Sequence, residues 1–214
     1  MTTFKALESS KEEDQNTLSI IEKNIDDLPD GDILIKVSYS SLNYKDALSA
    51  SGSPGVTKNY PHTPGIDAVG HVQESSDSAF KEGDVVIVTG YDLGMNTAGG
   101  FGQYIRVPAH WVIKLPNGLN EVEAMSLGTA GLTAGLSIQA LEKYSSTTGF
   151  EGSKSIVTGS TGGVGSIAVM LLSKLGSEVT AVTGKNTQKS FLENLGASEV
   201  ISREELSEMT RLPM

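Results

Sequence analysis

The segment covering residues 156–176 constrains the fold of this chain more than any other. An apolar run leads into a turn with glycines at positions 159, 162, 163 and 165, and an amphipathic segment, residues 166–176, follows at once. Glycine lets a backbone turn sharply and approach a ligand, and the N–H groups at a helix N-terminus attract a pyrophosphate. An ordinary strand-to-helix turn is the alternative. The complete strand–turn–helix order favours a dinucleotide-binding turn.

The next apolar run, residues 177–183, is typical of a buried parallel strand and indicates which dinucleotide is bound. In an NAD-binding unit this strand usually ends on an Asp or Glu that binds the ribose 2′-hydroxyl. Here Thr183, Gly184 and Lys185 follow instead, and Arg203 comes after a third apolar run, residues 199–202. Either cation alone is as easily a solvated surface charge. Together with the missing acid they favour NADPH over NADH, because cations bind a 2′-phosphate well.

Composition excludes several classes of function. The chain has 214 residues, a net charge of −10 and a pI near 4.7, which disfavours nucleic acid or an anionic membrane as the main partner. It contains no cysteine, so disulfides, thiolate metal sites and cysteine nucleophiles are excluded. No apolar run approaches the length of a membrane span, and the N-terminus does not resemble a signal peptide. We therefore expect a cytoplasmic protein with a small-molecule substrate.

The two parts of the chain differ in pattern. Before residue 117, short β-type runs recur between turn signals, at residues 32–39, 65–72, 84–89 and 102–107. Residues 121–144 are typical of a helix interrupted near Gly128, residues 145–149 of a loop, and strand and helix alternate after that. The predicted fold class is α/β: a β-rich domain over residues 1–120, then a parallel-sheet nucleotide domain over residues 121–214.

This arrangement resembles the medium-chain dehydrogenase/reductase superfamily. Within it, the chain is most similar to the zinc-independent quinone oxidoreductases, in the branch that includes acryloyl-CoA reductases. The matching stretches are residues 41–48, 64–70, 99–104, 128–134, 157–165 and 195–204. The resemblance implies a GroES-like N-terminal domain followed by a Rossmann sheet.

A zinc site is not predicted. The zinc-dependent members of the superfamily have a cysteine near the position of Asn43 or Tyr44, and Gly-His-Glu where this chain has Gly65, Ile66 and Asp67. A catalytic zinc needs three protein ligands, and only Asp67 remains here. We predict no metal. Asp67 itself is more often bound to backbone N–H groups in such a turn than used as a general acid.

Without a metal, the plausible chemistry is hydride delivery to an acceptor that is already electrophilic: a quinone, or an activated C=C bond such as that of an enoyl (acryloyl) thioester. Asn43 and Tyr44 are the candidate catalytic donors, with helix capping as the alternative for Asn43. The resemblance implies that Tyr44 contacts the nicotinamide end of the cofactor. It further implies that Thr161, Gly162, Gly163 and Val164 hold the phosphates, and that Thr183, Gly184, Lys185 and Arg203 bind the 2′-phosphate end.

The family fold continues beyond a third nucleotide-domain strand, where this chain ends, so a C-terminally truncated chain with a partial, three-strand Rossmann sheet is expected. A catalytically inactive remnant that at most binds nucleotide is therefore the alternative to an active reductase. An NAD-linked alcohol dehydrogenase is disfavoured by the absent zinc ligands and by Lys185. A full-length form is expected to be a homodimer.

Overall fold

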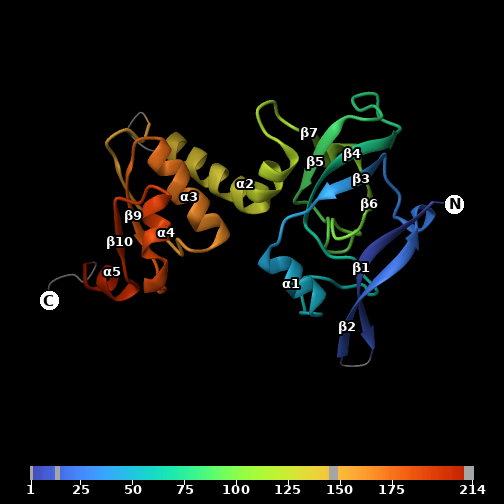
Figure 1. Ribbon diagram of the computed structural model, residues 1–214, viewed down its shortest axis with the longest axis horizontal. Helices are drawn as coiled ribbons and strands as arrows, with labels where there is room; N and C mark the ends of the chain where they lie inside the picture. The colour runs from blue at the N-terminus through green and yellow to red at the C-terminus, as the bar shows by residue number, and fades with distance from the viewer. Residues whose placement is uncertain (1, 13–14, 145–148, 210–214) are drawn as a thin grey trace. The chain divides into compact units, whose positions relative to one another are not determined.

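The computed structural model describes residues 2–12, 15–144 and 149–209 (Figure 1). Its contacts divide the chain into two compact units, Met1–Thr129 (unit 1) and Ala130–Met214 (unit 2). The predicted domain boundary, between residues 120 and 121, coincides with the start of helix α2, Glu121–Tyr144, which continues through this division. Of the predicted loop at residues 145–149, all but the last residue lie outside the described residues.

Unit 1 is built around a five-stranded sheet with the order β6-β3-β4-β5-β7, in which every neighbouring pair is antiparallel. Its strands are β3 (Ile33–Tyr39), β4 (Asp67–Ser75), β5 (Val85–Thr89), β6 (Tyr104–Val107) and β7 (Val112–Lys114). The four predicted β-type runs correspond to β3, β4, β5 and β6. The short β7 was not predicted, because three residues are too few to show an alternating pattern.

The core of unit 1 consists of β-branched and aliphatic side chains, and successive residues of these strands point to opposite faces of the sheet. Ile33, Ile35, Ala68, Val72, Val86, Val88, Leu93, Ile105, Val107 and Val112 form one buried cluster. A second cluster joins the first part of α2 to the sheet through Ala124 and Met125, which pack with Val69 and Ile87. The start of α2 is therefore part of unit 1.

An antiparallel hairpin of two ten-residue strands, β1 (Thr3–Glu12) and β2 (Gln15–Asn24), precedes the sheet. These strands were not predicted, because β2 is mostly exposed and shows no clear alternation. Backbone hydrogen bonds join the hairpin to the loops of unit 1: Leu7 N–H donates to Phe101 O at 2.9 Å, and Ser9 N–H to His62 O at 2.8 Å. The remaining elements of unit 1 are α1 (Tyr44–Ala50) and the 3-10 turns η1 (Ile25–Asp27) and η2 (Ala109–Trp111).

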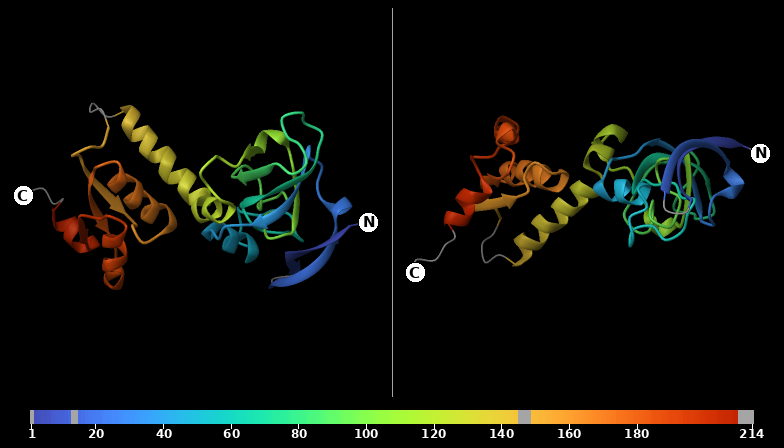
Figure 2. Two further views of the ribbon diagram at one scale, coloured as in Figure 1. Left: turned by 45° about the horizontal axis from the view of Figure 1, so that its top comes forward. Right: turned by 90° about the horizontal axis from the view of Figure 1, so that it is seen from below.

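Unit 2 contains the predicted parallel sheet, with the strand order β10-β9-β8 (Figures 1 and 2). The strands are β8 (Lys154–Thr158), β9 (Glu178–Val182) and β10 (Glu199–Ile201). The accompanying helices are α3 (Gly163–Lys174), α4 (Lys189–Asn194) and α5 (Arg203–Met209), with the 3-10 turn η3 (Asn186–Gln188). Ile138, Val169, Leu172, Val179, Ala181, Leu192 and Ala197 form the buried core of this unit.

Two helix details refine the predictions. Helix α3 begins at Gly163 rather than at the predicted residue 166, so Gly163 and Gly165 lie inside the helix and only Gly159 turns the chain with a positive φ, 62°. The predicted interruption of α2 is confirmed: Gly128 has φ 48° and ψ −149°, outside the helical region. Within the described ranges, no helix combines the length and apolar character that crossing a bilayer requires.

Candidate functional site

The turn between β8 and α3 leaves a helix N-terminus accessible. Gly162 is the N-cap residue, and its N–H donates to Gly159 O at 2.9 Å, which closes the turn. Among the residues that the structure describes, no side chain caps α3, and the first turn of this helix contains no acidic residue. Gly162, Gly163 and Val164 are exposed. The positive end of this 12-residue helix therefore faces a place where an anion can bind, as predicted for Thr161, Gly162, Gly163 and Val164.

Gly165 allows the helix to lie against this turn. A Cβ at position 165 would be 2.3 Å from Gly159 O and 2.8 Å from Ser160 Cα. Both neighbours are backbone atoms of the turn, so neither can move aside without changing its shape. The absence of a side chain here is what permits the close strand–turn–helix packing on which a pyrophosphate cradle depends.

Ser160 holds the turn to the neighbouring strand, a role that was not predicted from the sequence. It is fully buried, and its Oγ lies 2.6 Å from Val157 O, to which it donates. The same Oγ accepts the Val182 N–H at 3.0 Å. The phosphate turn is thereby fixed to the end of β9. No feature of the sequence separates Ser160 from the adjacent Thr161, since both are small hydroxyl residues in a glycine-rich run.

The predicted 2′-phosphate residues gather at the carboxyl ends of β9 and β10. Thr183 is buried, and its Oγ1 accepts the Lys185 N–H at 3.0 Å. A Cβ at Gly184 would lie 3.6 Å from Arg203 Nε, so the guanidinium group borders the space that the glycine leaves open. Lys185 and Arg203 are both exposed, and neither takes part in any ion pair among the described residues.

Arg203 is the first residue of α5, and a reciprocal cap fixes this helix start. Ser202 N–H donates to Glu205 Oε2 at 2.6 Å, and Glu205 N–H donates to Ser202 Oγ at 3.1 Å. The hydrogen bonds that Glu205 accepts from Ser202 lower the pKa of its carboxyl group, so this group stays ionised and the cap stays intact at neutral pH.

The two candidate catalytic residues belong to unit 1, at the start of α1. Asn43 is the N-cap residue of α1, and its Nδ2 donates to Ser41 Oγ at 2.8 Å and to Asp67 Oδ2 at 2.9 Å. Both amide hydrogens of Asn43 are therefore used inside the protein. Tyr44 is the first residue of the helix, and its side chain is 81% exposed. Of the two, Tyr44 is exposed and Asn43 is half-buried.

Two buried carboxylates hold this segment against β4. Asp67 is completely buried and accepts hydrogen bonds from Ser41, Asn43 and Thr129, including the Thr129 backbone N–H at 2.9 Å. This agrees with the predicted backbone contact rather than an acid in contact with solvent. Asp46 accepts the Asn43 and Ile66 N–H groups at 2.7 and 2.8 Å. Burial raises the pKa of Asp46, and the nearby charge of Asp67 adds to this effect.

The histidines do not gather into a metal site. His62 is buried, and its Nε2 has no hydrogen-bond partner among the described residues. His71 pairs with Glu121 at 2.9 Å, and His110 contacts the Tyr91 ring. In the part of the chain that the structure describes, no group of three His, Cys, Asp or Glu side chains is placed to bind a metal ion. The absence of a catalytic metal stays a prediction.

Prolonged dialysis against a chelator is the test of that prediction. We expect no change in the thermal unfolding temperature, in NADPH affinity or in any reductase activity, because Asp67 is enclosed by hydrogen-bond donors and no cysteine is available. Elemental analysis before and after dialysis provides the control. Stoichiometric zinc that is lost together with activity would contradict the prediction.

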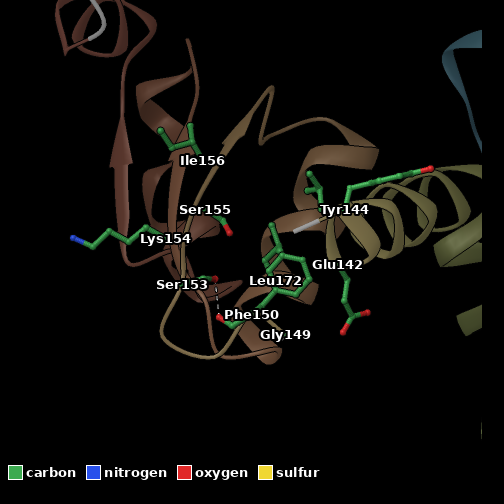
Figure 3. A pocket seen from close by; sticks show the side chains of 10 residues that line it. Glu142, Tyr144, Gly149, Phe150, Ser153, Lys154, Ser155, Ile156 and Leu172 are labelled. Carbon is green, nitrogen blue, oxygen red and sulfur yellow. Dashed lines mark hydrogen bonds between the residues drawn. The ribbon is translucent and has the colours of Figure 1, made fainter. Parts of the chain in front are cut away.

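A cavity of about 520 Å³ lies beside β8, away from the predicted cofactor residues. Figure 3 shows that Tyr144, Phe150, Ile156 and Leu172 border it, and a hydrogen bond from Ser153 Oγ to Phe150 O, 2.7 Å long, closes one side. Ile156 is 59% exposed, and β8 pairs only with β9 among the described strands. The cavity therefore belongs to the open edge of the sheet and not to the phosphate turn.

The fold and the turn together define a class of protein: a β-rich domain joined to a dinucleotide-binding parallel sheet. The comparisons with known proteins agree with this class. Residues 29–117 match the family model "Alcohol dehydrogenase GroES-like domain". The chain belongs to the medium-chain dehydrogenase/reductase superfamily, in the quinone oxidoreductase group that contains YhfP and AcuI.

Three relatives locate the chain within this group. It is 44% identical over 209 residues to the Bacillus subtilis protein YhfP, described as a putative quinone oxidoreductase. It is 41% identical over 213 residues to the acrylyl-CoA reductase AcuI of Ruegeria pomeroyi. The crystal structure of the YhdH oxidoreductase from Salmonella enterica in complex with NADP is 40% identical, with a TM-score of 0.89 over 94% of this chain and 61% of that one.

The matches cover nearly all of this chain but only part of each relative. The matches include 98% and 99% of this chain but only 63% of YhfP and 64% of AcuI. The structure of YhfP contains NAD rather than NADP. It superimposes on this chain with a TM-score of 0.91, over 99% of this chain and 64% of YhfP. The relatives thus bind either dinucleotide.

Proposed function

We propose that this chain provides the GroES-like domain and the dinucleotide phosphate site of a zinc-independent, NADPH-dependent oxidoreductase. The proposed acceptor is a quinone or an activated C=C bond, such as that of an enoyl (acryloyl) thioester. The names of YhfP and AcuI support these two acceptor classes. The observation on which the proposal depends most is the open helix N-terminus at Gly162. It is supported by Lys185 and Arg203 at the ends of β9 and β10, which take part in no ion pair among the described residues.

NADPH, when bound, supplies the hydride, and the residues of the chain orient the reactants and exclude water. The turn at residues 161–164 would hold the pyrophosphate, and Ser160 would keep that turn in place. An already conjugated acceptor spreads the negative charge that develops on hydride addition, so a neutral hydrogen-bond donor suffices to stabilise it. Tyr44 is the favoured donor, because its side chain is exposed whereas both amide hydrogens of Asn43 are already used.

NADPH is favoured over NADH because no carboxylate follows β9 and because Lys185 and Arg203 flank Gly184 there. The YhfP structure contains NAD, so the preference of this chain for NADPH over NADH has to be measured. A chain that binds nucleotide without turnover is the second candidate, since it spans less than two thirds of YhfP and AcuI. A small-molecule substrate, a homodimer, a cytoplasmic location and the absence of nucleic-acid and membrane partners remain part of the proposal.

Replacing Lys185 by alanine in the full-length protein tests the cofactor assignment. We expect NADPH binding to weaken by about 1–3 kcal/mol, the usual value of a charge-assisted phosphate contact, and NADH binding to be nearly unchanged. Isothermal titration with both cofactors measures the difference. The matched control is Lys189→Ala, which removes an exposed lysine that pairs with Glu193 on α4. Equal losses for the two cofactors would show that Lys185 does not contact the 2′-phosphate.

A further inference from the structure

Asp67 is a buried carboxylate that the proposed chemistry does not use. Its side chain accepts four hydrogen bonds, and none of the described ion pairs involves it. Leaving a buried charge without a cation is costly unless hydrogen bonds satisfy it, so the four donors account for its stability. What remains to be explained is why the fold places a carboxylate here.

The donors come from two segments far from Asp67 in sequence. Ser41 and Asn43 precede α1, and Thr129 follows the interruption of α2, 62 residues after Asp67. Gly128 makes the approach possible: a Cβ there would lie 2.7 Å from Asp67 Oδ2. The carboxylate thus joins the first residue of β4 to the start of α1 and to the resumed helix α2.

The two carboxylate oxygens have different partners. Oδ2 accepts from Ser41 Oγ, from Asn43 Nδ2 at 2.9 Å and from Thr129 N at 2.9 Å, whereas Oδ1 accepts from Thr129 Oγ1 at 2.7 Å. A hydroxyl group can donate or accept. An asparagine with its oxygen at the Oδ2 position and its NH₂ at the Oδ1 position would therefore keep all four bonds, with Thr129 Oγ1 accepting.

We propose that Asp67 is a positioning residue: through Asn43, the N-cap of α1, it fixes the first turn of that helix and hence Tyr44. The role depends on the geometry of the accepted hydrogen bonds and not on the charge or a proton of Asp67. The inference rests on the proposed function, in which Tyr44 contacts the nicotinamide end of the cofactor and donates to the acceptor.

The test compares Asp67→Asn, which keeps the bonds and removes the charge, with Asp67→Ala, which removes both. The first readout is amide hydrogen exchange of α1, Tyr44–Ala50, in the full-length protein. We expect Asp67→Asn to exchange within about threefold of wild type, and Asp67→Ala to exchange at least roughly tenfold faster, the effect of losing about 1.4 kcal/mol of local stability. Asp77→Ala, in the turn after β4, serves as the control substitution.

The second readout is steady-state kinetics with NADPH. Asp67→Ala should lower kcat more than it raises KM, and Asp67→Asn should restore kcat, because a displaced Tyr44 affects the reacting geometry more than binding. If Asp67→Ala fails to fold, Asn43→Ala is the replacement variant. It removes the hydrogen bond between Asn43 and Asp67, and Asp67 keeps its three other hydrogen bonds. We expect the same faster amide exchange of α1 in this variant.

Two results would overturn the proposal. If Asp67→Asn behaves like Asp67→Ala in both readouts, the charge or the proton matters and Asp67 is not merely a positioning residue. If α1 exchanges at the wild-type rate in Asp67→Ala, or in Asn43→Ala where that variant replaces it, the connection to Tyr44 does not exist. The two proposals can also fail separately. If the wild-type protein shows no turnover but the variants still show the expected exchange pattern, the proposed function is refuted and the positioning of α1 by Asp67 is supported.

Discussion

Replacing Gly165 by alanine is expected to lower the affinity of the full-length protein for NADPH at least about 100-fold, equivalent to about 2.7 kcal/mol. The added Cβ would lie 2.3 Å from Gly159 O and 2.8 Å from Gly159 C. Because both atoms belong to the backbone of the phosphate turn, either the turn or the start of α3 must move. The same movement would strain the hydrogen bonds of Ser160 to Val157 and Val182.

Fluorescence or calorimetric titration measures this loss. The matched control is Gly135→Ala in α2, where a Cβ would meet nothing within 4 Å and where alanine is the better helix former. The control should bind NADPH as the wild type does and be slightly more stable. If the Gly165→Ala variant keeps its affinity within a few-fold, the turn at residues 159–165 is not the phosphate site.

Replacing Asp46 by alanine is expected to destabilise unit 1 by about 2–6 kcal/mol, because two N–H groups lose their acceptor and each costs about 1–3 kcal/mol. The two orphaned groups would be the N–H groups of Asn43 and Ile66, which donate to Asp46 at 2.7 and 2.8 Å. Urea unfolding followed by near-ultraviolet circular dichroism, which reports on Trp111 in unit 1, measures the loss. Asp26→Ala, in the exposed turn η1, should change stability little. If Asp46→Ala loses no more unfolding free energy than Asp26→Ala does, Asp46 does not fix α1.

The stability contributed by Asp46 should also depend on pH in a defined direction. Burial raises its folded-state pKa above the ordinary value of 3.8, so the folded chain holds a proton here in a pH window where the unfolded chain has lost it. This contribution is fully present below 3.8 and falls as the pH rises through the folded-state pKa. The excess stability of the wild type over Asp46→Asn, which cannot titrate, should therefore shrink from acid to neutral pH. An excess that grows instead would mean that the folded-state pKa is lowered.

The nucleotide-binding unit could be predicted from the sequence because the residues that form it follow one another closely along the chain. A strand, a glycine turn and a helix within residues 154–174 define the predicted phosphate site, and the carboxyl ends of neighbouring parallel strands lie at the same edge of the sheet. For this reason Gly184, after β9, and Arg203, after β10, come together in the structure. The start of α3 was misplaced by three residues, since glycines at 163 and 165 suggest a turn but are accommodated in the first helical turn.

The features that were missed depend on distant parts of the chain. The β1–β2 hairpin has a largely exposed second strand, and its place is fixed by backbone bonds to residues 62 and 101 that no local pattern reveals. The hydrogen bonds of Asp67 to Thr129 cross 62 residues. Asn43 was a candidate donor with helix capping as the alternative, and the structure shows it as the N-cap of α1; its bond to Asp67, however, follows only from the packing of α1 against β4.

The measurement that tests the central proposal most directly is hydride transfer from deuterated NADPH. NADPH carrying deuterium at the transferable position is incubated with the full-length, chelator-treated protein and an acryloyl thioester, and the product is analysed by mass spectrometry. The hydride equivalent adds to the β-carbon, a proton from water adds to the α-carbon, and NADP⁺ is released. We predict a saturated thioester with one deuterium at the β-carbon, or, with a quinone as acceptor, a hydroquinone formed in proportion to the NADPH consumed. Binding of NADPH without consumption in the presence of either acceptor would contradict the proposal and favour the second candidate, nucleotide binding without turnover.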